Sequence, residues 1–328
     1  MAKDPRDMNQ SIHHFRDVHV HAAAVQGWNQ TYSQISAGVT DSTLMQVSSR
    51  RCHAFRERIN RRVVQHGEAP RDKVCFAIPV SMPGAIRVQG RDADDNSIFF
   101  LRSGEEFMCH MPMGMDLLSL TFDRELFENA LANVPSGEDI KSLLRQAVVR
   151  VPAERFKASR QRMMAMFSEA LVNEELTDSH AREAEFEQAM IEEMLQLVTD
   201  PACDRSQRSG TSVHSFIVEK CHRLALSDTL NAPNVLELCQ RLQVSRRTVQ
   251  NSFRLVAETT PLHYLRSVRL NGVRRTLKNT RAADLSIGDA ASQWGFFHLS
   301  HFAAEYQELF GELPSQTERA ALVRHYDA

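Results

Sequence analysis

The sequence predicts an α+β protein in which a strand-rich N-terminal part precedes a helical segment and an all-helical C-terminal third. Between positions 40 and 123, apolar and polar residues alternate and turn residues recur roughly every 8 to 12 positions, as in a small barrel or sandwich. After Pro152, apolar residues recur at helical spacing. The C-terminal third contains two pairs of short amphipathic helices. The 328 residues suffice for about two domains.

The strand-rich part is indicated by short runs with a period of two. Leu118, Leu120 and Phe122 alternate with other residues in one of these runs. Pro83-Gly84 and Asp94-Asp95-Asn96 supply turns between such runs. We therefore expect several short strands to form the core of the N-terminal domain.

Two helices of about 20 residues are predicted after the strands, at Glu154–Glu174 and Ser179–Val198. Methionines line one face of each, and this pattern indicates either packing within the domain or a seam between two copies. The polar segment 200–212 is interpreted as a linker. The predicted domains are thus 1–199 and 213–328.

The composition excludes several classes of protein. The chain is 42% hydrophobic and 24% charged, which is ordinary for a globular protein. Its longest apolar runs are far shorter than the ~18 residues of a membrane span, and the N-terminus lacks the apolar core of a secretion signal. The six cysteines form no CxxC pair, so we expect reduced thiols in a cytoplasmic protein without membrane contact.

No catalytic site, metal site or cofactor is predicted. Glycine-rich phosphate loops and the HExxH and GxSxG motifs are absent. The alternation of Asp17, His19 and His21 is a weak indication of a metal, but the spacing defines no ligand geometry. A mobile N-terminus is the preferred interpretation.

The first helix pair lies between Val235 and Val256. Apolar side chains at i, i+3, i+4 and i+7 mark one short helix, and Ser245 is placed to cap the next one. The second helix buries Val249 and Phe253 and presents long polar side chains on its other face. Arginine pairs with guanine, and glutamine or asparagine with adenine, in the major groove of DNA. The candidate base- and phosphate-contacting residues of this helix are Arg246, Arg247, Gln250, Asn251 and Arg254.

The second pair lies between Ser286 and Phe310, and a longer helix at Pro261–Asn279 joins the two pairs. That connecting helix would span ~27 Å, which could hold two reading helices about one DNA turn (~34 Å) apart.

Charge is unevenly distributed over the C-terminal third. Residues 235–281 contain 10 basic and 2 acidic side chains, a net +8, whereas the whole chain carries −2. From Asp284 through Glu318 there is no lysine or arginine and there are six acids. We therefore expect phosphate attraction to come from the first pair and the connecting helix, and the second pair to bind weakly or to offer an acidic surface to RNA polymerase.

Residues 214–325 resemble the AraC family of bacterial transcription regulators. The resemblance rests on VSRRTVQNSFRLVAETTPLHYLRSVRLNGVRRTL and SIGDAASQWGFFHLSHFAAEYQELFGELPS. The stretch WGFFHLSHFAAEYQELFG is similar to the ethanolamine-operon type of regulator. Membership implies a ligand-sensing or dimerising N-terminal domain with a barrel-like (cupin-like) fold, and two helix-turn-helix units in the C-terminal domain.

Carried onto this chain, the family's first recognition helix corresponds to Arg246–Val256 and the second to His298–Glu308. The resemblance implies base contacts from Arg247, Gln250 and Asn251 in the first. In the second, the reading positions are His298, Leu299, Ser300 and Ala303. The sequence departs from the family pattern here, because relatives often carry arginine near position 304.

The predicted function is a sequence-specific transcription activator. Its expected partners are double-stranded operator DNA, RNA polymerase, a second copy of the chain and a small-molecule effector. One alternative is a constitutive regulator whose N-terminal domain holds no ligand. The other is a DNA-repair alkyl transferase, because Cys221-His222-Arg223 resembles the active site of such enzymes.

Overall fold

The computed structural model describes residues 8–320 except 85, 135–144, 173–179, 201, 204–212 and 232. The described residues form two compact units. The first draws on Met1–Tyr32, Asp41–Asn60 and Gln65–Gly210, and the second on Ser33–Thr40, Arg61–Val64 and Thr211–Ala328. Most of the proposed linker 200–212 lies outside the described residues. No helix in the described part is long and apolar enough to cross a membrane.

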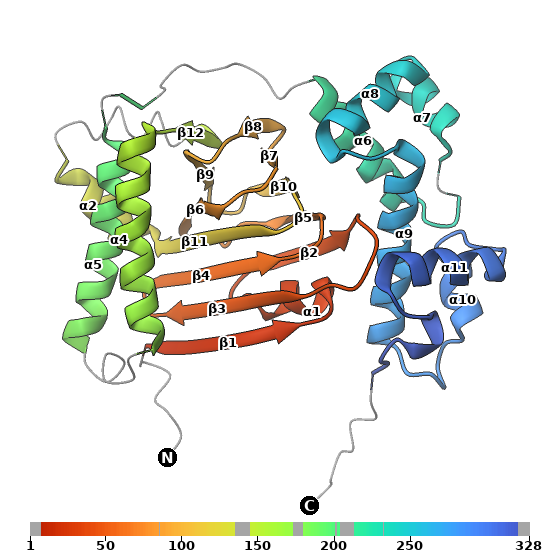
Figure 1. Cartoon of the computed structure of the whole chain (residues 1–328), viewed down its shortest axis with the longest axis horizontal. Coiled ribbons are helices and arrows are strands. Elements are labelled where there is room, and N and C mark those ends of the chain that lie inside the picture. Colours follow the sequence, from red (N-terminus) through yellow and green to blue (C-terminus); the bar gives the residue numbers. More distant parts are fainter. Residues whose placement is uncertain are drawn as a thin grey trace, which may run out of the picture. The chain divides into compact units, whose positions relative to one another are not determined.

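The N-terminal unit is built on two sheets (Figure 1). The seven-stranded sheet has the order β1-β3-β4-β11-β6-β9-β12, and the five-stranded sheet has the order β2-β5-β10-β7-β8. Neither sheet is closed, so the strands observed form two open layers rather than a continuous barrel. The strands are β1 (Asn9–Phe15), β2 (Asn29–Gln34), β3 (Ser42–Ser48), β4 (Cys52–Ile59), β5 (Val63–Glu68), β6 (Lys73–Ser81), β7 (Ile86–Val88), β8 (Arg91–Ala93), β9 (Ser97–Leu101), β10 (Glu106–Met111), β11 (Met115–Asp123) and β12 (Val148–Arg150).

The side chains of the central strand β11 point alternately to the two faces of the seven-stranded sheet. It pairs antiparallel with β6, so that Leu118 is opposite Ile78 and Leu120 is opposite Phe76. Because successive side chains of a strand point to opposite faces, these residues share one face and their neighbours share the other. Both faces of β11 are buried, which is why its alternation is less clean than that of a half-exposed strand.

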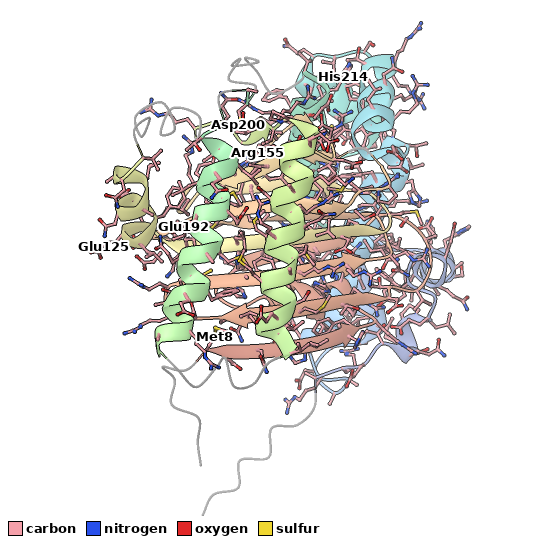
Figure 2. All side chains as sticks on the ribbon, turned by 60° about the vertical axis from the view of Figure 1, so that its left-hand side comes forward. Met8, Glu125, Arg155, Glu192, Asp200 and His214 are labelled. Carbon is pink, nitrogen blue, oxygen red and sulfur yellow. The ribbon has the colours of Figure 1, made fainter. Side chains whose placement is uncertain are left out.

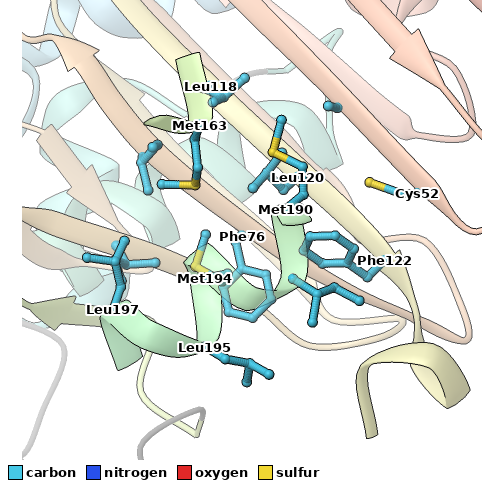
Figure 3. Close-up of a cluster of buried hydrophobic side chains, with 14 of the residues drawn as sticks. Cys52, Phe76, Leu118, Leu120, Phe122, Met163, Met190, Met194, Leu195 and Leu197 are labelled. Atoms are coloured by element: carbon cyan, nitrogen blue, oxygen red, sulfur yellow. The ribbon is translucent and has the colours of Figure 1, made fainter. Parts of the chain in front are cut away.

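Helices α4 (Ala153–Val172) and α5 (His180–Val198) cover one face of the seven-stranded sheet. Figure 2 shows them side by side across the strands. Met163, Met190 and Met194 are fully buried in a cluster with sheet residues such as Phe76 and Leu120 (Figure 3). The two helices were predicted, and their methionines pack within one chain. The alternative of a seam between copies is wrong for these side chains.

The N-terminal segment is regular, contrary to expectation. Residues 9–15 form β1, which pairs along its whole length with β3. Asp17 caps the following helix α1 (Val18–Ala24), because its Oδ1 accepts hydrogen bonds from the backbone nitrogens of His19 (2.8 Å) and Val20 (3.2 Å). The alternation of Asp17, His19 and His21 is therefore a helix start. Among the described residues no group of three or more His, Cys, Asp or Glu side chains could hold a metal ion.

A further helix, α2 (Arg124–Ala132), follows β11 in the N-terminal unit. The C-terminal unit is helical, which confirms the predicted α+β class with sheets first and a helical domain last. Its helices are α6 (Val213–Ser227), α7 (Val235–Leu242), α8 (Arg246–Ala257), α9 (Pro261–Asn279), α10 (Ile287–Ser292), α11 (Leu299–Phe310) and the short 3-10 helix η2 (Pro314–Gln316).

Candidate nucleic-acid interface and candidate effector cavity

The first helix pair of the C-terminal unit is defined by its caps. Asn234 and Glu237 form a reciprocal capping box at the start of α7. Helix α7 ends at Gln243, whose φ of 51° is left-handed, and two residues later Ser245 starts α8. Its Oγ accepts a hydrogen bond of 3.0 Å from the backbone nitrogen of Thr248, as predicted. The tight turn between α7 and α8 therefore lies between the C-cap Gln243 and the N-cap Ser245.

The cap at Ser245 gives a testable contribution to stability. Replacing Ser245 with alanine leaves a backbone donor in the first turn of α8 without its partner, so we expect a loss of about 1 kcal/mol in unfolding free energy. Urea denaturation of the full chain would measure it. Ser245→Asp, which restores an acceptor, is the matched control and should retain most of the stability. Equal losses in both variants would show that the cap bond is not the cause.

Helix α8 separates its residues into a core face and an outer face. Val249 and Phe253 are fully buried, and the Phe253 ring meets the Tyr264 ring edge-on with centroids 5.0 Å apart. The predicted contact residues lie on the opposite side. Those that are exposed are Arg246, Arg247, Gln250 and Arg254, whereas Asn251 is half-buried. The amphipathic spacing thus presents these arginine and glutamine side chains together.

The second helix pair, α10 and α11, presents a different surface. Ser286 caps α10 by accepting from the backbone nitrogen of Asp289 at 3.1 Å. His298, at the start of α11, makes no capping side-chain bond. His298, Leu299 and Ser300 are exposed, and Phe297 just before them is 68% exposed. Three of the four predicted reading positions therefore lie at the surface, whereas Ala303 is half-buried, and none of the four is a lysine or arginine.

Packing within the C-terminal unit joins the second pair to α9. A Cβ atom added to Gly272 of α9 would lie 2.3 Å from the ring of Trp294, which follows α10. Only glycine permits this approach. Phe302, Tyr306 and Leu309 complete the core beneath α11. The second pair is thus supported along the connecting helix.

Most arginines of α9 form ion pairs or contacts with aromatic rings inside the C-terminal unit. This corrects the expectation that the connecting helix is a main source of phosphate attraction. Arg274 is buried, with its Nη1 2.8 Å from Glu312 Oε1 and its guanidinium 4.6 Å from the centre of the Phe310 ring. Arg266 pairs with Glu305 of α11 at 2.5 Å. Glu305 and Glu312, two of the six acids between Asp284 and Glu318, therefore neutralise arginine charges of α9.

Two more α9 arginines are half-buried against aromatic rings. The guanidinium of Arg269 lies 5.0 Å from the centre of the Phe296 ring, and that of Arg275 lies 6.0 Å from the Trp294 ring. Burial lowers the pKa of both side chains, and the nearby Arg266 lowers the pKa of Arg269 further. The sequence showed the arginines and acids but not their pairing, because partners such as 274 and 312 are far apart along the chain.

Cys221 does not have the environment of a nucleophile. It is fully buried on α6, and burial raises the pKa of its thiol to about 12, with a smaller contribution from Cys239. The neighbouring His222 is also buried, and its Nδ1 lies 3.0 Å from the Tyr264 hydroxyl. Since the thiolate is the reactive form, the alkyl-transferase alternative loses its nucleophile.

A cavity lies in the N-terminal unit and is lined from both sheets. Leu117 and Ser119 of β11 line it, whereas Leu118 and Leu120, on the opposite face, pack in the cluster under α4 and α5. This division follows from the alternation of side chains along β11. The cavity is not visible in the sequence because its walls come from many strands.

A buried polar network adjoins this cavity. The Tyr32 hydroxyl donates to Glu57 Oε1 at 2.6 Å, and His21 Nε2 lies 3.0 Å from the same oxygen. His21 Nδ1 lies 2.9 Å from Ser42 Oγ. Burial, followed by the Glu57 carboxylate, raises the pKa of Tyr32 well above its usual value, so its hydroxyl stays a donor. Glu57 and Tyr32 both line the cavity.

Comparisons with known proteins agree with the features of the C-terminal unit. Residues 238–320 match a family model described as a helix-turn-helix domain. Over 82 residues, 25% of this chain, the sequence is 40% identical to the XylDLEGF operon transcriptional activator of Pseudomonas putida. Over 90 residues, 27% of this chain, it is 32% identical to the probable thc operon regulatory protein of Rhodococcus erythropolis.

The matched segments span 26% and 27% of those two relatives, about a quarter of each. The crystal structure of the AraC-like transcriptional activator CuxR is similar over 88% of this chain and 100% of its own, with a TM-score of 0.43 and 15% identity. The family model begins within α7 and runs past α11, so it covers most of the first helix pair and all of the second. The C-terminal unit therefore carries a helix-turn-helix domain of the type found in AraC-family regulators.

Proposed function

We propose that the protein is a sequence-specific DNA-binding transcription regulator that acts as an activator. The observation that carries this proposal is the outer face of α8, where Arg247 and Gln250 are exposed beside Arg246 and Arg254 over a buried apolar core. Such a helix suits the major groove, where arginine and glutamine read base edges. The activator role rests on the Pseudomonas putida relative, which is named a transcriptional activator.

Both helix pairs act as helix-turn-helix units in this proposal, with α8 and α11 as the recognition helices. The family model covers most of the first pair and all of the second, which supports this assignment. Selection from random DNA duplexes with the full chain would test it. We expect an enriched site with two parts about one helical turn apart. Recovery of no preferred sequence at low salt would contradict the proposed function.

In this proposal the second helix-turn-helix unit, formed by α10 and α11, reads DNA mainly through apolar contacts. Leu299 is 51% exposed at the first turn of α11, and the preceding Phe297 is more exposed still. Apolar side chains recognise the thymine methyl group in the major groove. We therefore assign Leu299 to thymine recognition, with His298 and Ser300 contacting the backbone.

Thymine recognition can be tested by removing the methyl group. Replacing the critical thymine by deoxyuridine should weaken binding of the wild-type chain about fourfold, since a buried methyl contributes ~0.8 kcal/mol. The same replacement should have no effect on Leu299→Ala. Leu262→Ala, which changes another exposed leucine of this unit, is the control and should keep the full methyl effect. If deoxyuridine weakened binding equally for the wild-type chain, Leu299→Ala and Leu262→Ala, Leu299 would not be the residue that recognises the methyl group.

The N-terminal domain senses a small molecule in this proposal, through the barrel-like (cupin-like) arrangement of its sheets around the cavity. An effector that binds one arrangement of the chain more tightly than another shifts the population toward it. Homodimerisation and contact with RNA polymerase complete the proposal. Since Met163, Met190 and Met194 are buried within the chain, pairing of two copies would use other residues.

A further inference from the structure

The cavity of the N-terminal unit contains buried hydrogen-bond donors that lack a partner. Gln65 is 4% exposed, and its Nε2 has no hydrogen-bond acceptor. The indole Nε1 of Trp28 is also buried without an acceptor. Both residues line the cavity. Gln30 Nε2, a third donor without a partner, also lines the cavity. Buried donors are normally satisfied, so unsatisfied donors on one cavity indicate a ligand that supplies acceptor atoms.

The remaining wall favours a flat apolar molecule. Most of the lining side chains are aromatic or aliphatic. The Trp28 ring meets Phe55 and Phe107 edge-on, each with centroids 5.8 Å apart, and this fixes the indole in the wall. The aromatic side chains of the wall suit a compound with one ring and a short substituent.

The charge of the wall argues against an ionic ligand. No lysine, arginine or histidine is found among the described residues that line the cavity, and Glu57 is the one carboxylate there. A carboxylate ligand would add a second negative charge in a site that offers no cation. A cationic ligand would compete for a carboxylate that Tyr32 and His21 already engage. The electrostatics therefore favour an uncharged molecule.

We propose that the cavity binds an uncharged ring compound with an acceptor oxygen, such as an aryl ketone or amide, held by Trp28 Nε1 and Gln65 Nε2. This inference deepens the proposed function, because it names the chemical class of the effector. The ring would lie among the aromatic side chains of the two sheets, and the oxygen would face the two donors.

The chain has only two tryptophans, Trp28 and Trp294, and this provides a direct assay. Trp294→Phe leaves Trp28 as the sole indole, so its emission reports on the cavity. Acetophenone is the neutral probe with an acceptor oxygen, and ethylbenzene is a neutral compound without that oxygen. Benzoate is the anionic probe and phenyltrimethylammonium the cationic one. We expect acetophenone to change Trp28 emission saturably and to raise the melting temperature of the wild-type chain, and the other three to bind more weakly.

Variants of the two donors test their roles. Trp28→Phe and Gln65→Leu should each weaken acetophenone binding about fivefold, the effect of one lost hydrogen bond. Gln188→Leu, at an exposed glutamine of the same unit, should leave it unchanged. If Trp294→Phe fails to fold, the melting shift of the wild-type chain gives the same comparison of probes.

Tighter binding of benzoate or phenyltrimethylammonium than of acetophenone would overturn the proposal, as would acetophenone binding that ignores both donor variants. No saturable response to acetophenone up to its solubility limit would overturn it too. DNA binding is measured separately on the same preparations. A chain that selects an operator but binds no neutral probe refutes this inference alone, whereas a chain that selects no DNA refutes the proposed function.

Discussion

Arg247→Ala and Gln250→Ala should each weaken binding to the selected operator by about 1–3 kcal/mol and relax base preference at the position they read. Both side chains are exposed on α8, where loss of the side chain removes a contact without disturbing the core. The double variant His298→Ala, Ser300→Ala should cost less, because the start of α11 presents no cation. Fluorescence anisotropy with labelled operator duplexes would measure all three.

Arg71→Ala is the matched control, since it removes the same charge from an exposed site of the N-terminal unit. It should leave operator binding nearly unchanged. If the His298, Ser300 variant abolished binding while the α8 variants were harmless, the division of labour between the two helices would be reversed.

Acidification should destabilise the chain by several kcal/mol between pH 6.5 and 4. Burial lowers the pKa of His53 to about 4 and, together with the nearby Arg87, that of His110 to about 3. In the unfolded chain both titrate near 6.5. The unfolded state therefore binds more protons in this range, so stability is fully present above pH 6.5 and falls as the pH drops. At pH 5 the loss is about 2 kcal/mol for each histidine.

Urea unfolding at pH 7 and pH 5 measures this loss. His53→Gln and His110→Gln should each reduce the difference between the two pH values, because glutamine does not titrate. His13→Gln, at an exposed position of β1, should leave it unchanged. A difference that persisted in the variant with both His53 and His110 replaced would assign the acid sensitivity to other groups.

The C-terminal helices were predictable because their signals are local. Each cap, such as Ser245, lies within three residues of the group it satisfies, and the apolar spacing identifies the buried side of α8. The exposed arginine and glutamine face followed from the same spacing. These are short-range effects, and one sequence contains them in full.

The features that were missed depend on residues distant in sequence. The neutralisation of Arg274 by Glu312 and the cavity between the sheets arise only when separate elements pack together. The strand β1 was missed because its alternation is polar on both faces, with His13 and His14 exposed. Its pairing with β3 defines it, and pairing is not visible along one strand.

The pairing of α9 arginines with acids of the second helix pair has a consequence for ionic strength. Displacement of condensed counterions from DNA scales with the number of phosphates that a protein neutralises. Arginines whose charge is already compensated, such as Arg266 and Arg274, displace few of them. The logarithm of affinity should therefore fall less steeply with the logarithm of salt concentration than the net charge of residues 235–281 implies. Discrimination among operators would then persist in concentrated electrolyte.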